Sequence, residues 1–341
     1  MKLTDIMGQE HIISLLTASL ESGRISHAYL FFGPEGTGKT TTAMLFAMAL
    51  NCERKGEDKD LPCGICSSCK RMKNFNYPDF QVIEPSGLSI KIDQIREVQR
   101  EIGLKSYEGG WRIFLIKDAE TMTIEAGNSL LKVLEEPTDG CVLILISHNY
   151  LEMLETIRSR CQLMEFRKMP SPVLEELLIE KYSCSPERAL LLSGLADGAI
   201  GRALHLNEDD GFFSLREKVL NLLSDHMNPD ILKALNFYEE LEDSKDKDKS
   251  REVVLDILDI MKTWYRDLVV YSYCGDTLLL INQDRKYNII EEAKVYSIDR
   301  LQEMIQKIDE VRYGIERAKG ANLPLAIDRI FMELFSEKLG H

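Results

Sequence analysis

Residues 28–50 read Ala-Tyr-Leu-Phe-Phe-Gly-Pro-Glu-Gly-Thr-Gly-Lys-Thr-Thr-Thr-Ala-Met-Leu-Phe-Ala-Met-Ala-Leu. An apolar run typical of a strand precedes the glycines, and a run typical of a buried helix follows them. Residues 33–40 match the pattern G-x-x-x-x-G-K-[ST] at every required position. In this context the backbone N–H groups, the helix N-terminus and Lys39 can surround an anion, whereas a glycine turn with a chance lysine would lack the flanking strand and helix. The sequence therefore predicts a nucleotide-binding loop made by Gly33, Pro34, Glu35, Gly36, Thr37, Gly38, Lys39, Thr40 and Thr41, with the Thr40 hydroxyl facing a magnesium ion.

The charge of the chain limits how it meets nucleic acid. The 341 residues carry 42 basic and 56 acidic side chains, a net charge of -14. Non-specific binding to nucleic acid needs clustered Lys and Arg, so we expect any action on DNA to go through partners. The longest aliphatic run, Val142–Ile146, is too short to cross a bilayer. The N-terminus has no apolar signal region, and we expect a cytosolic protein with no membrane partner.

Short apolar runs alternate with helical patterns over the first half of the chain. The runs cover residues 28–32, 79–84, 111–116, 141–146 and 163–166. Alternating strands and helices predict a parallel sheet with helices on both faces. After Pro170 only helical patterns remain, and apolar stripes within 255–268, 301–315 and 323–335 predict a helical bundle. The charged stretch 239–249 is interpreted as a solvated loop or helix end.

Four cysteines follow the predicted helix of the phosphate loop. Cys52, Cys63, Cys66 and Cys69 have the spacing C-x10-C-x2-C-x2-C. Four thiolates suit a tetrahedral, structural Zn²⁺ with no position left for a reacting water. Iron–sulfur ligation is an alternative whose common spacings do not match, and free surface thiols would oxidise readily. The other four cysteines are scattered and are interpreted as ordinary residues.

The end of the strand at 111–116 bears on hydrolysis. A hydrolysing site of this class needs one carboxylate to hold the metal and usually a second to polarise water. If the first position is residue 117, Lys117 stands where the metal ligand belongs. A register one residue later makes Asp118 the ligand but puts Ala119 in the water-activating place. Either register predicts nucleotide binding with weak or absent hydrolysis by this chain alone.

Several short motifs occur in one order along the first half of the chain. They are Gly8-Gln9, Ser26-His27-Ala28-Tyr29-Leu30, the phosphate loop, the four cysteines, the stretch 128–137 (Asn-Ser-Leu-Leu-Lys-Val-Leu-Glu-Glu-Pro) and Ser159-Arg160-Cys161. Together they resemble the AAA+ subunits of bacterial DNA polymerase III clamp loaders. The resemblance implies a RecA-like P-loop domain over 1–168 with a zinc module at about 52–76, a helical lid over 169–208 and a helical collar domain for oligomerisation over 209–341.

That family contains ATP-hydrolysing motors (gamma/tau) and a related non-motor type (delta prime). Motors resemble each other in carrying Asp-Glu where this chain has Lys117-Asp118. In the segment 197–203 a glycine stands where a motor's phosphate-sensing arginine is expected, and Arg202 follows it. These departures favour the non-motor type, while a gamma/tau-type motor and a stand-alone P-loop kinase or repair ATPase remain alternatives.

The resemblance also implies partners and a role for one arginine. Arg160 would reach out of its own subunit to ATP bound by a neighbour, as an arginine finger supplied in trans; an ordinary surface ion pair is the alternative. The stretch Ser147-His148-Asn149, at the end of the strand 141–146, is where a polar residue would sense phosphate. The implied cofactors are structural Zn²⁺ and ATP or ADP with Mg²⁺. The implied partners are gamma/tau and delta subunits in a pentamer, with the sliding clamp and primed DNA reached through that complex.

Overall fold

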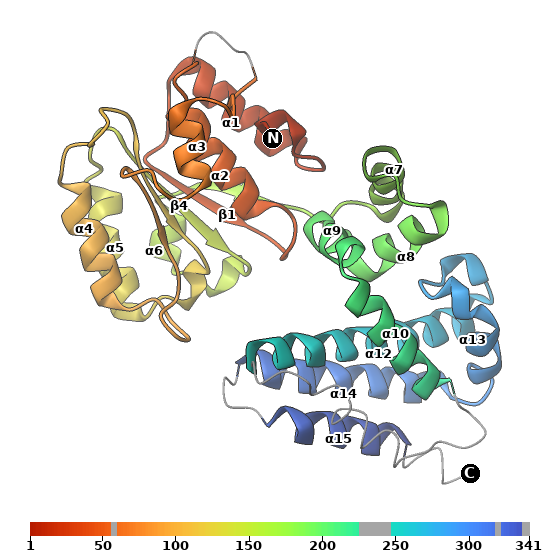
Figure 1. The fold of residues 1–341 in the computed structure, drawn as a ribbon. Coiled ribbons are helices and arrows are strands. Elements are labelled where there is room, and N and C mark those ends of the chain that lie inside the picture. Colours follow the sequence, from red (N-terminus) through yellow and green to blue (C-terminus); the bar gives the residue numbers. More distant parts are fainter. Residues whose placement is uncertain (56–59, 225–246, 318–321, 336–341) are drawn as a thin grey trace. The chain divides into compact units, whose positions relative to one another are not determined.

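The structure is a computed structural model that describes residues 1–55, 60–224, 247–317 and 322–335 (Figure 1). Contacts within the chain divide it into two compact units. Unit 1 consists of residues 1–170 together with 198–201, and unit 2 consists of residues 171–197 together with 202–341. Each unit is described by itself.

Unit 1 is built on a five-stranded sheet. Its strands are β1 (Ala28–Phe32), β2 (Phe80–Ile83), β3 (Arg112–Ile116), β4 (Cys141–Ser147) and β5 (Gln162–Glu165). All neighbouring strands are parallel, in the order β2-β3-β4-β1-β5. Every predicted strand is therefore confirmed, with ends shifted by one residue at most.

Helices cover both faces of this sheet. They are α1 (Glu10–Ser22), α2 (Lys39–Leu50), α3 (Ser67–Lys73), α4 (Ile92–Ile102), α5 (Ile124–Glu135) and α6 (Glu155–Arg158). Side chains alternate along β1, so Tyr29 and Phe31 join the core under α1, α2 and α3, while Ala28 and Leu30 join the core under α4, α5 and α6. Both faces are thus buried, as the uninterrupted apolar strands require.

All secondary-structure elements in the described residues of unit 2 are helices. Its helices are α7 (Ser171–Tyr182), α8 (Pro186–Ala196), α9 (Ile200–Glu208, whose first two residues belong to unit 1), α10 (Asp210–Leu223), α12 (Lys247–Cys274), α13 (Lys286–Glu292), α14 (Ile298–Arg317) and α15 (Leu323–Phe335). The expected apolar stripes fall on α12, α14 and α15, and Trp264 and Leu268 of α12 are fully buried.

The predicted combination of an α/β region with an all-helical region is confirmed. Of the charged stretch 239–249, residues 239–246 lie outside the described residues and 247–249 begin α12. None of the helices that the structure describes is both long and apolar enough to cross a membrane.

Candidate nucleotide and metal sites

The predicted phosphate loop lies between β1 and the N-terminus of α2. Gly33 has a φ of 137°, and a Cβ built there would lie 2.1 Å from the backbone oxygen of Phe166, so no side chain fits. The Gly33 N–H donates to the Ser147 carbonyl at the end of β4. Gly38 is the N-cap of α2, and Lys39 is its first residue. The nine predicted loop residues are therefore continuous from the strand end into the first turn of the helix.

Lys39 is buried inside this loop. Only 4% of the residue is exposed, and its Nζ donates to the carbonyls of Gly33 and Pro34 at 2.6 Å each. Burial, only partly offset by nearby carboxylates, lowers the pKa of Lys39 to about 8. At neutral pH the side chain is still mostly protonated, so the loop presents a cation with short contacts to its own backbone.

His148 joins the phosphate loop to the end of β3. Its Nδ1 lies 3.3 Å from Nζ of Lys39, and its Nε2 lies 3.0 Å from Oδ1 of Asp118. An ammonium only donates and a carboxylate only accepts. The neutral tautomer with its proton on Nε2 therefore satisfies both contacts. The Glu120 carboxylate accepts the backbone N–H of His148 at 3.0 Å.

Lys117 does not enter this network. Its Nζ contacts the Glu84 carboxylate, just beyond β2, at 2.6 Å. Asp118 has a left-handed backbone conformation, with φ 48° and ψ 47°, and a short 3-10 helix, Ala119–Thr121, follows it. This turn brings Asp118 and Glu120 to the same histidine. One carboxylate oxygen from each acidic residue and one imidazole nitrogen of His148 all lie within 4.8 Å of one another. Two carboxylates, at positions 118 and 120, thus lie near the loop. Both registers that the sequence offered placed the metal ligand and the water-activating residue at consecutive positions.

The Asp118 contact raises the pKa of His148 above its usual 6.5, against the effects of burial and of Lys39. Replacing Asp118 with Asn is therefore expected to lower this pKa. Because the folded-state pKa is the raised one, the contact stabilises the fold most below about pH 6.5, and the contribution is lost as the pH rises through the folded-state value. NMR titration of the imidazole, assigned with His148→Gln, measures the pKa.

Asp139→Asn provides the matched control for this titration. Asp139 precedes β4 at its opposite end, so its removal changes the net charge equally without touching His148. A His148 pKa that moves equally in the two variants would contradict the direct contact.

Arg160 lies just beyond α6 on the surface of unit 1. Its Nη2 contacts the Glu135 carboxylate at the end of α5 at 2.8 Å, and its Nη1 donates to the Thr156 carbonyl at 3.0 Å. The side chains of Arg160 and Glu135 are 36% and 52% exposed. Exposed ion pairs of this kind are weak, so the guanidinium can exchange Glu135 for a stronger anion.

Arg202, which follows the glycine noted in the segment 197–203, points elsewhere. Its guanidinium pairs with Asp259 of α12 within unit 2. It therefore does not replace the arginine that a motor would carry one position earlier.

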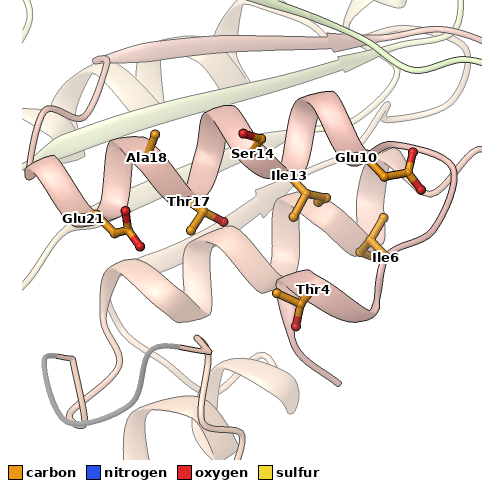
Figure 2. Close-up of a pocket in the computed structure, with 8 residues that line it drawn as sticks. All are labelled: Thr4, Ile6, Glu10, Ile13, Ser14, Thr17, Ala18 and Glu21. Carbon is orange, nitrogen blue, oxygen red and sulfur yellow. The ribbon is translucent and has the colours of Figure 1, made fainter.

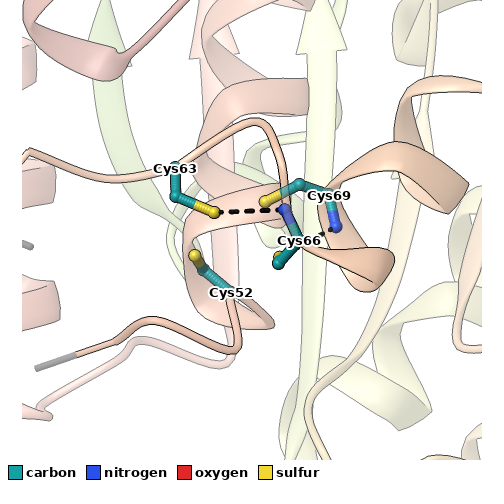
Figure 3. A group of neighbouring side chains, drawn as sticks. All are labelled: Cys52, Cys63, Cys66 and Cys69. Carbon is teal, nitrogen blue, oxygen red and sulfur yellow. Dashed lines mark hydrogen bonds between the residues drawn. The ribbon is translucent and has the colours of Figure 1, made fainter. Parts of the chain in front are cut away.

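The four predicted cysteines come together in one cluster (Figure 3). Cys52 follows α2, Cys66 caps α3 and Cys69 lies within α3. All four Sγ atoms lie within 4.8 Å of one another. Sulfurs around a tetrahedral zinc ion with the usual bond length are about 3.8 Å apart. The cluster is therefore close to ligating geometry and could hold a metal ion.

Backbone N–H groups donate hydrogen bonds to two of these sulfurs. The N–H of Cys66 donates to Cys63 Sγ and the N–H of Cys69 donates to Cys66 Sγ, each at 3.4 Å. Burial opposes ionisation of Cys63, but hydrogen bonds from backbone N–H groups and from the Cys52 and Cys66 side chains together outweigh it and lower the pKa of this thiol to about 7. Burial raises the pKa of Cys52 and Cys69. A divalent cation would offset that cost, because metal binding favours the thiolate.

Two surface grooves of unit 1 lie outside these sites. One, of about 440 Å³, runs along α1 between apolar Ile6 and Ile13, with Glu10 and Glu21 at its rim (Figure 2). The other, of about 450 Å³, lies beside Gln9, whose side chain makes two hydrogen bonds to the backbone of Arg167. Neither groove is lined by a predicted site residue.

Sequence reasoning missed Glu120 and Glu135 as neighbours of the site residues. Glu120 could have been considered from its place two residues after Asp118, but its approach depends on the left-handed turn. Glu135 lies within the 128–137 motif, yet its contact with Arg160 joins segments 25 positions apart in the chain. No local sequence pattern predicts such a contact.

Two family models match this sequence. Both describe the DNA polymerase III delta subunit; one matches residues 8–170 and the other, for the C-terminal part, matches residues 210–334. The first match ends where the continuous part of unit 1 ends.

Two relatives match over long stretches. DNA polymerase III subunit delta' of Bacillus subtilis is 39% identical over 63% of this chain and 64% of its own length. DNA polymerase III subunit tau of the same organism is 29% identical over 99% of this chain and 61% of its own length. The chain thus covers less than two thirds of the length of either relative.

A solved structure has the same fold. A DNA polymerase III gamma subunit-related protein from Thermotoga maritima matches with a TM-score of 0.53 and 17% identity, over 95% of this chain and 99% of the other. At this identity the likeness concerns the fold alone.

Proposed function

Because the chain belongs to the DNA polymerase III delta subunit family, we propose that it is the non-hydrolysing, delta-prime-type member of a clamp-loading complex that supplies Arg160 to ATP bound by a neighbour. The complex would contain gamma/tau-type and delta-type subunits in a pentamer and act in the cytoplasm. It would open a sliding clamp and close it around primed DNA. The P-loop domain (1–168), lid (169–208) and collar (209–341) are part of this proposal.

The phosphate loop would hold ATP or ADP. The loop amides and the Lys39 ammonium are of the right kind for a phosphate chain, and Thr40 would face its Mg²⁺. To bind phosphate, Lys39 must exchange its contacts with the Gly33 and Pro34 carbonyls. Binding would then leave Nδ1 of His148 available as a neighbouring polar group.

The observation that carries the non-hydrolysing role is the engagement of Asp118. Its carboxylate is bonded to His148 Nε2, and Lys117 is paired with Glu84. Neither of the two residues after β3, Lys117 and Asp118, therefore offers an unpaired carboxylate beside the loop. Glu120 is also occupied, by the His148 backbone N–H. This arrangement supports holding a nucleotide without directing water at it.

Arg160 would act across a subunit boundary. Its planar, permanently charged fork matches the oxygens of a transferring phosphoryl group. The surface position and the exposed Glu135 partner suit a side chain that must leave its own subunit. The four cysteines would hold a structural Zn²⁺, which fixes α3 against the end of α2 and takes no part in this chemistry.

Assembly tests this proposal. The full chain, mixed with a gamma/tau-type and a delta-type subunit from the same organism, is expected to elute with them as one complex from gel filtration. A chain that stays monomeric at micromolar concentrations of both partners would contradict membership of the complex. Mass measurement of the eluted species gives the number of copies.

A gamma/tau-type motor is the second candidate. The intact phosphate loop and the match to the tau relative over 99% of this chain favour it. The two candidates differ in whether the isolated chain turns over ATP.

A further inference from the structure

Four residues of unit 1 come from a distant part of the chain. Residues 198–201 pack with unit 1, although the residues on both sides of them belong to unit 2. Two backbone hydrogen bonds hold the segment: the Met169 N–H donates to the Gly198 carbonyl at 2.8 Å, and the Gly201 N–H donates to the Gly36 carbonyl at 2.8 Å. The second bond ends on the phosphate loop itself.

Close approach at this point requires glycine. A Cβ built on Gly201 would lie 3.0 Å from the oxygen and 3.4 Å from Cα of Gly36. At the other end of the segment, Gly198 has a φ of +78°, and a Cβ there would lie 2.4 Å from the Met169 oxygen. A side chain at Gly201 would press on the phosphate loop, and one at Gly198 would collide with the backbone of Met169.

The hydrogen bond from Gly201 also orients the next amide of the loop. The C=O of Gly36 and the N–H of Thr37 belong to one peptide unit, which is planar and, when trans, directs the two groups to opposite sides. With the carbonyl turned toward Gly201, the Thr37 N–H is turned away from α9. Thr37 is 2% exposed, and its hydroxyl donates to the Pro34 carbonyl within the loop at 2.8 Å.

We propose that Gly201 is a positioning residue of the phosphate loop: its backbone N–H holds the Gly36 carbonyl outward and thereby keeps the Thr37 N–H directed at the phosphates of a bound nucleoside di- or triphosphate. This inference rests on the proposed nucleotide site. It adds that the fit of this loop to phosphate depends on a residue 165 positions away in the sequence. Gly201 acts through its backbone and touches no ligand.

Gly201→Ala tests the inference. Alanine favours the helix α9, so the variant should fold, but its Cβ must displace the Gly36 carbonyl by a few tenths of an ångström. Calorimetric titration of the full chain with ADP and Mg²⁺ is expected to give a Kd raised about fivefold, the effect of one lost hydrogen bond. Faster hydrogen exchange at the Gly201 amide, with an unchanged melting temperature, should accompany it.

Gly314→Ala is the matched control, because Gly314 also lies in a helix and a Cβ there meets nothing within 4 Å. Its Kd should equal that of the wild type. If the wild type binds ADP and Gly201→Ala binds it equally well, the inference fails while the nucleotide site stands. If the wild type itself binds no nucleotide, both fail. Lys39→Ala separates loop binding from binding elsewhere, since it should abolish the first.

Discussion

In a clamp-loading complex assembled with the Arg160→Ala variant, ATP turnover at the site that borders this subunit is expected to be about 10³-fold slower. The reason is electrostatic: the charge that develops on the transferring phosphoryl group loses the one cation that this subunit would supply across the boundary. The guanidinium, now paired with exposed Glu135 at 2.8 Å, would be the missing cation. The measurement compares the ATP turnover of gamma/tau-type and delta-type subunits with and without this chain. The difference in rate reports on the bordering site.

Two variants sharpen this test. Arg160→Lys keeps the charge but loses the planar fork, so it should recover only part of the rate. Arg96→Ala removes an exposed arginine of α4 that pairs only one turn away with Asp93, and it should leave the rate unchanged. An Arg160→Ala subunit that co-elutes with its partners and sustains the wild-type rate would contradict the finger assignment.

Loss of the metal is expected to have the second large effect. The wild-type chain should carry one zinc ion, and Cys69→Ser should lose it. The binding free energy of structural zinc in small modules is about 10–16 kcal/mol near neutral pH, and it becomes folding free energy. Cys52 and Cys69 belong to the core that α1 and α2 share, so the variant should also melt at a markedly lower temperature.

Metal analysis and thermal melting measure these two quantities together. Cys274→Ser is the control, because Cys274 is an exposed free thiol at the end of α12 and its loss should change neither. Zinc retained at one equivalent in Cys69→Ser would contradict the ligand set. Bound iron with visible absorbance would show that the cysteines hold an iron–sulfur cluster and not zinc.

The three central strands of unit 1, β1, β3 and β4, could be predicted because each is buried on both faces. A parallel strand under two layers of helix has no polar face, and runs such as 141–147 are apolar at nearly every position. The phosphate loop could be predicted for a different reason. Its glycines are required by close contacts, such as the one between Gly33 and Phe166, and such requirements leave a fixed spacing in the sequence.

The surroundings of the loop could not be predicted in the same way. Whether Lys117 faces the loop or Glu84 depends on the turn at Asp118, whose left-handed backbone is uncommon for a residue other than glycine. The contact between Gly201 and Gly36 depends on how residues 198–201, which end in the first two residues of α9, pack within unit 1. Such tertiary contacts leave no periodic signal along the chain.

ATP turnover by the isolated 341-residue chain in the presence of Mg²⁺ is the decisive measurement. We expect labelled ATP to bind to the phosphate loop and to stay intact over many minutes, because Asp118 and Glu120 are held by His148. Magnesium-dependent release of phosphate that Lys39→Ala abolishes would contradict it, and would make this chain a motor.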